Sequence, residues 1–139
     1  MSLRVLVPMD DSKLAERALR YALETLPDAE ITVLHVVGGP SPMMGEATRV
    51  ALEDDAERGG DEAAEKLLET ARDIAAEYDV EIQTRVATGH PARQIVDIAE
   101  DFDTVVIGSH GSSVVERLFV GNVTETVFRR CPVPVTVVR

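Results

Sequence analysis

Three glycines, Gly108, Gly111 and Gly121, have the spacing that is most suggestive of chemistry in this sequence. They follow an apolar run over 105–107 that is typical of a buried strand, and they lead into an apolar periodicity over 120–127 that is typical of a helix. Glycine lets the backbone approach an anion closely, and the first N–H groups and the dipole of a helix favour negative charge. The pattern predicts a phosphate-binding loop, with a plain turn as the alternative.

Two polar residues accompany these glycines in the prediction. Asp10 follows the first apolar segment, where a carboxylate can bond a ribose hydroxyl or help to hold Mg²⁺ beside phosphates. The alternative for Asp10 is a carboxylate that complements the start of a helix next to Ser12. His110 lies inside the glycine loop, where its ring or its backbone N–H can reach an anion, and the alternative is a surface histidine.

No catalytic constellation accompanies the loop. The sequence has no Gly-x-Ser-x-Gly elbow, and its three histidines lack the spacing of metal ligands. The loop is not a Walker A sequence, because no Gly-Lys-Ser/Thr follows it, and the Gly-x-Gly-x-x-Gly dinucleotide fingerprint is absent. We therefore assign no catalytic residue, and any nucleotide hydrolysis is expected to be slow.

Strand-like and helix-like segments alternate along the whole chain. Strands are expected over 3–8, 31–37, 80–86, 104–107 and 133–138, and helices over 12–26, 47–58, 61–78, 91–99 and 120–127, with a break at Gly59-Gly60. Clean alternation over 80–86 and Pro134 in the last segment indicate two edge strands. The prediction is a single α/β domain over 1–139. It is an open parallel sheet of strand order 3-2-1-4-5 with helices on both faces. Its ligand crevice lies between strands one and four.

Composition narrows the classes of partner. The formal net charge is −11, which disfavours nucleic acid and anionic lipid as partners. The single cysteine, Cys131, excludes a disulfide within the chain and suits a reducing compartment. No apolar run approaches the length of a membrane span, and residues 1–4 lack the layout of a signal peptide, so we expect a cytoplasmic protein.

These residues resemble the universal stress protein family over essentially the whole chain. Nucleotide-binding members carry Gly-x2-Gly-x9-Gly-Ser/Thr, which the three glycines match, with Asn122 where the hydroxyl residue is expected. The segments at 7–12, 34–36, 89–91, 106–111 and 132–135 fit further landmarks of the family.

The resemblance implies an ATP- or AMP-binding domain, with Mg²⁺ as a possible companion held by Asp10. Positions that line the adenosine site match Met9, Asp10, Val36 and Ile107, and Pro8 belongs to the same segment. Positions that contact phosphate match Gly108, His110, Gly111, Gly121, Asn122 and Val123. The resemblance also implies a homodimer through the last strand, which agrees with an edge strand that needs cover.

Three functions stay open from the sequence. The first is a nucleotide-binding regulatory or stress-response module. The second is a nucleotide-free interaction protein that docks partners through its acidic surface or the 38–60 segment, because an asparagine replaces the expected hydroxyl at Asn122. The third is an enzyme, such as a weak ATPase or a phosphoacceptor receiver; a receiver also needs an aspartate after the third strand and a lysine after the last, which this chain lacks.

The basic residues are almost all arginine, since Lys13 and Lys66 are the only lysines. High acid content with little lysine suggests a protein adapted to high salt, with an ordinary acidic protein as the alternative. Because salt screens self-repulsion, we expect the midpoint of thermal unfolding to rise as KCl increases from dilute to molar concentration. Equal stability at both salt concentrations would contradict this hypothesis.

Overall fold

A five-stranded parallel sheet forms the centre of the molecule, as the sequence predicted. The computed structural model describes residues 2–38, 46–109 and 122–139, with the backbone only over 46–61. The strands are β1 (Arg4–Pro8), β2 (Glu30–Val37), β3 (Gln83–Thr88), β4 (Thr104–Gly108) and β5 (Val135–Val138). Their order is β3-β2-β1-β4-β5 and every pair is parallel, so β3 and β5 are the edges.

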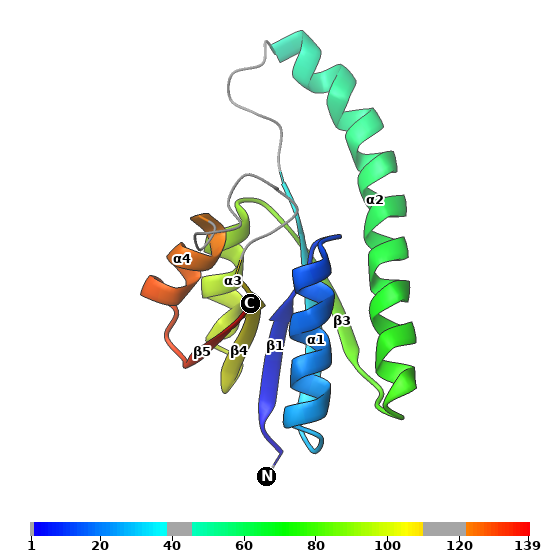
Figure 1. The fold of residues 1–139 in the computed structure, drawn as a ribbon. Coiled ribbons are helices and arrows are strands. Elements are labelled where there is room, and N and C mark those ends of the chain that lie inside the picture. Colours follow the sequence, from blue (N-terminus) through cyan, green and yellow to red (C-terminus); the bar gives the residue numbers. More distant parts are fainter. Residues whose placement is uncertain (1, 39–45, 110–121) are drawn as a thin grey trace.

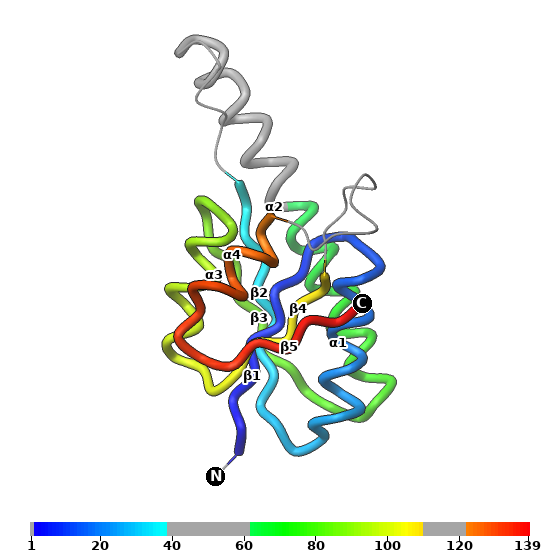
Figure 2. The backbone as a smooth tube through the Cα atoms, turned by 60° about the vertical axis from the view of Figure 1, so that its left-hand side comes forward, coloured from blue at the N-terminus to red at the C-terminus, as the bar shows by residue number. Residues whose placement is uncertain are grey.

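Helices cover both faces of this sheet (Figure 1). The described helices are α1 (Lys13–Thr25), α2 (Glu46–Glu77), α3 (Pro91–Ala99) and α4 (Asn122–Arg130). One core cluster joins α1 and α2 to the sheet, and a second joins α3 and α4 to the opposite face. Figure 2 shows the two pairs of helices on either side of the strands. Among the described helices, none combines the length and apolar character needed to cross a bilayer.

The ends of two strands differ from the prediction. The strand expected over 80–86 is hydrogen-bonded over Gln83–Thr88, because β3 follows the register of β2. Val80 and Ile82 still pack against the core, whereas Val86 is 48% exposed. The last strand begins at Val135, after both prolines, because proline lacks the N–H that a ladder needs.

The predicted helix break at Gly59-Gly60 was wrong. The helix α2 runs from Glu46 to Glu77 without interruption. An internal glycine costs roughly 1 kcal/mol relative to alanine, and the segment around this pair is rich in alanine and glutamate, which favour helix. The apolar stripe from Ala64 to Tyr78 was predicted correctly, and it packs on the core beside β1 and β2.

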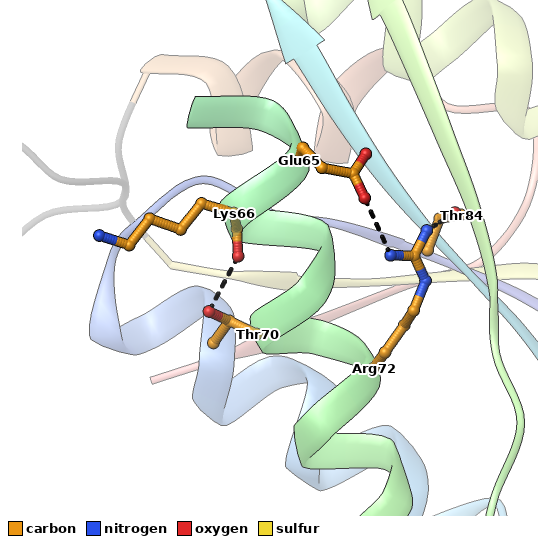
Figure 3. A network of polar contacts seen from close by, with 5 residues as sticks. All are labelled: Glu65, Lys66, Thr70, Arg72 and Thr84. Carbon is orange, nitrogen blue, oxygen red and sulfur yellow. Dashed lines mark hydrogen bonds and ion pairs between the residues drawn. The ribbon is translucent and has the colours of Figure 1, made fainter. Parts of the chain in front are cut away.

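Polar contacts hold α2 against its neighbours. Arg72 donates to Thr84 of the edge strand β3 at 3.1 Å and to Glu65 at 3.3 Å (Figure 3). On the other side of α2, Arg20 of α1 donates to Glu77 at 2.6 Å, and this hydrogen bond raises the pKa of the guanidinium. The Arg20–Glu77 ion pair joins two helices, whereas the Arg72–Glu65 ion pair lies within α2. Both pairs are exposed, so each contributes little to stability.

Asp79, just beyond the end of α2, adopts a left-handed backbone conformation with φ of 57°. Replacing Asp79 by Gly removes the steric cost of that conformation, and we expect the free energy of unfolding to rise by about 1 kcal/mol. Asp79→Asn removes only the charge at the negative end of the helix dipole, and it should raise the free energy of unfolding by about 0.3 kcal/mol. Urea denaturation of both variants measures this difference, and an Asn variant more stable than the Gly variant would refute the backbone explanation.

Candidate functional site

The two loops singled out in the sequence meet at one edge of the sheet. The strands β1 and β4 are neighbours, so the residues that follow Pro8 and those at Gly108 emerge side by side at the carboxyl edge. Connections leave this point toward opposite faces, with α1 after β1 on one face and α4 after β4 on the other. This is the topological switch point at which open α/β sheets bind ligands.

A cavity of about 190 Å³ opens at this point. Seven of the predicted site residues line it: Pro8, Met9, Asp10, Val36, Ile107, Gly108 and Val123. Asn122 is the first residue of α4 and is exposed, but it is not part of the wall. His110, Gly111 and Gly121 lie outside the described residues.

The cavity wall also contains residues that the sequence did not single out as a site. They come from the ends of β2 and from the first turns of three helices: Ser12, Ala15, Leu34, His35, Pro91, Ile95 and Thr124. Most of them belong to the apolar stripes of their helices and strands. They were missed in the sequence because an apolar stripe looks the same for a packed core residue and for a residue of a cavity wall.

The start of α1 explains how Asp10 is placed. The Asp10 carboxylate accepts a hydrogen bond from the Ser12 N–H at 2.9 Å, and the Ser12 hydroxyl accepts from the Ala15 N–H at 3.1 Å. Ser12 is therefore the N-cap of the helix that was predicted over 12–26, and Asp10 has the helix-start role that was its alternative interpretation. No cluster of three metal-ligating side chains occurs within the ranges that the structure describes.

His35 is half-buried at the edge of the cavity, and its Nδ1 lies 3.0 Å from the Met9 carbonyl oxygen. A carbonyl oxygen only accepts, so Nδ1 carries the proton in this contact. The ring therefore links β2 to the end of β1, and this ring nitrogen has its hydrogen-bond partner within the fold.

Three helices begin at the cavity wall. Ser12 caps α1, Pro91 is the first residue of α3, and Val123 and Thr124 lie in the first turn of α4. His90, the N-cap of α3, makes no side-chain hydrogen bond to that helix. No lysine or arginine is among the described residues of the wall. The groups of this wall that favour negative charge are therefore the backbone N–H groups at the helix starts, while Asp10 contributes a carboxylate.

Gly108 has a structural reason to be glycine. A Cβ at this position would lie 3.0 Å from the Leu14 carbonyl oxygen and 3.1 Å from the Leu14 carbonyl carbon. The sequence had explained this glycine by the close approach of an anion, whereas the structure shows the close approach of the α1 backbone. The absence of a side chain lets the end of β4 and the first turn of α1 enclose the cavity together.

The universal stress protein family profile matches residues 1–139. The chain belongs to the universal stress protein family. A universal stress protein of Methanocaldococcus jannaschii is 32% identical, over 98% of this chain and 94% of that protein. The solved structure of UspA from Lactobacillus plantarum superposes with a TM-score of 0.83 at 25% identity, covering 99% of this chain and 97% of that one.

A third relative bears on ligands. The structure of a universal stress protein in complex with cAMP superposes with a TM-score of 0.69 at 25% identity, covering 99% of this chain and 97% of that chain. An adenine nucleotide is therefore a ligand of a protein that shares this fold and family.

Gly108→Ala should lower the free energy of unfolding by about 1–3 kcal/mol, because the new methyl group meets backbone atoms of Leu14 that move only with α1. Gly38→Ala is the matched control, since a Cβ at Gly38 meets nothing within 4 Å, and its change should stay within about 0.5 kcal/mol. Urea unfolding of the two variants tests the close approach, and equal losses of stability would argue against it.

Proposed function

We propose that this chain binds an adenine nucleotide, ATP or AMP, in the cavity between β1 and β4 and acts as a dimeric regulatory module of the stress response. The observation that carries the proposal is the convergence of three helix N-termini on a cavity at the topological switch point. An anion gains from the dipoles and N–H groups of these helices. That gain does not depend on basic side chains, which the described wall lacks.

The rest of the wall suits a base. Leu34, Val36, Ile95 and Ile107 give the cavity an apolar side that lies against the second core cluster. Ligand sites combine apolar walls with a few placed polar groups, and a purine ring buries its faces well against such aliphatic side chains. The polar groups near β1 are those of Asp10 and Ser12, at the end where a ribose would lie.

Asp10 is the carboxylate of the described wall that would hold Mg²⁺ beside the phosphates. Mg²⁺ commonly binds one or two protein carboxylates together with substrate phosphates and water, so a single carboxylate is compatible with this role. The side chain already accepts from Ser12, which fixes its orientation.

Asn122 is the specific observation that favours the second candidate, a nucleotide-free interaction protein. A Ser or Thr hydroxyl at this position both donates to phosphate and caps the helix. The asparagine amide can also donate to phosphate. Asn122 is the first residue of α4 rather than its N-cap, so the phosphate contact is the role that bears on this chain. We therefore keep nucleotide binding as the first proposal.

The dimer in this proposal forms through β5. This strand is an edge of the sheet, and Val135, Val137 and Val138 are only half-buried. An apolar edge strand invites pairing with another strand, and a second copy of the chain would cover it. Native mass spectrometry of the purified protein reports subunit number and retained nucleotide together.

Isothermal titration calorimetry with ATP and Mg²⁺ at high salt tests the binding proposal. The wild type should bind, and Val123→Trp should weaken binding about tenfold or more, because a large ring at the cavity wall fills the ligand volume. Val86→Trp is the control, since Val86 is an exposed valine outside the wall.

The absence of heat with wild-type protein at millimolar ATP would refute nucleotide binding. The variant Asn122→Ser separates the two candidates. Binding that appears only in this variant would assign the natural chain to the nucleotide-free class, whereas similar binding in both would favour the first proposal.

A further inference from the structure

Thr124 makes a buried contact that ties α4 to the end of β4. Its hydroxyl donates to the Gly108 carbonyl oxygen at 2.8 Å, and the residue is only 3% exposed. The two residues are separated by 16 positions, and both line the cavity. This hydrogen bond joins α4 to the sheet, whereas the Thr126 hydroxyl donates to the Asn122 carbonyl within the helix.

Gly108 is itself held from two other directions. On the side of α1, the Leu14 backbone leaves no room for a side chain, since a Cβ at Gly108 would lie 3.0 Å from the Leu14 carbonyl oxygen. On the side of β5, Gly108 is in register with Val138, and the next residue, Ser109, donates to the Val138 carbonyl at 2.7 Å. The acceptor of the Thr124 hydroxyl therefore has a fixed position, and the bond transmits that position to α4.

The first turn of α4 is the part of the cavity wall that this bond controls. Thr124 is its third residue, and Val123 beside it lines the cavity. The N–H groups of a first turn have no partner within the helix, so their distance from a ligand depends on where the whole helix end lies. The dipole effect falls off within one turn, which makes it sensitive to small shifts of the helix.

We propose that Thr124 is a positioning residue: its hydrogen bond to Gly108 sets the distance between the first turn of α4 and the ligand, and so contributes affinity for the phosphate part of a nucleotide but not for the nucleoside part. This inference rests on the proposed function. In the proposed binding mode, the nucleoside part lies against the apolar wall that includes Leu34, Val36 and Ile95, which this bond does not hold. Loss of the bond should therefore lower the affinity for the phosphate part and leave the affinity for the nucleoside part unchanged.

The test compares ATP with adenosine as calorimetric ligands. In the wild type, ATP should bind more tightly than adenosine. Thr124→Val keeps the shape of the side chain and removes the hydroxyl, and it should weaken ATP binding about tenfold, the order of a partly buried helix-terminus interaction, with adenosine affinity changed by less than about twofold. Thr124→Ser keeps the hydroxyl and should restore the preference for ATP.

A merely structural role would lower the unfolding midpoint without changing the ratio of the two affinities. An unchanged ratio in Thr124→Val, with wild-type binding intact, would overturn this inference and leave the proposed function standing. A wild type that binds neither ligand would overturn both. If the Val variant fails to fold, Thr124→Ala paired with Thr124→Ser isolates the same hydroxyl.

Hydrogen exchange of the wild-type protein gives a readout that needs no variant. ATP should slow exchange of the amides of residues 122–124, and adenosine should leave them unchanged. Equal protection by the two ligands would show that the first turn of α4 does not respond to phosphate, and the inference would fall.

Discussion

The close approach of the α1 backbone to Gly108 is the contact on which the geometry of the cavity depends. Three elements meet at this residue: Leu14 of α1 lies against its Cα, Val138 of β5 pairs with it, and Thr124 of α4 donates to its carbonyl. A side chain at this point would push α1 away from β4. The cavity is then a consequence of packing, because the same contact that seats α1 on the sheet brings its first turn to the switch point.

The arrangement of strands could be predicted because edge and central strands have different sequences. Alternation before Val86 and the prolines before Val135 indicated edges, and continuous apolar runs indicated β1 and β4 at the centre. With parallel connections, few orders satisfy these constraints. Helix starts were predictable for a similar reason, since serine is favoured as an N-cap and proline at the first helical position, which Ser12 and Pro91 occupy.

Other features depend on tertiary contacts that a local pattern does not contain. The Gly59-Gly60 pair has the composition of a break, yet α2 continues through it, because two glycines cost a helix less than its packed stripe contributes. The alternating pattern placed Val86 on the apolar face of its strand, but its side chain is exposed at the edge of the sheet. Leu34 and Ile95 have the periodicity of core residues, and only the three-dimensional packing shows that one side of each meets a cavity.

The charge of the molecule and the potential of its cavity have different physical origins. The net charge of −11 resides in side chains, and the ion pairs of the described residues are exposed, where water weakens their attraction. In the proposed function, the attraction for a phosphate at the switch point would come from backbone dipoles at the starts of α1, α3 and α4 rather than from surface side chains. An acidic surface is therefore compatible with the proposed binding of a nucleotide in this cavity. Acidic substitutions can accumulate on the outer faces of the helices as long as their first turns keep their positions against the sheet.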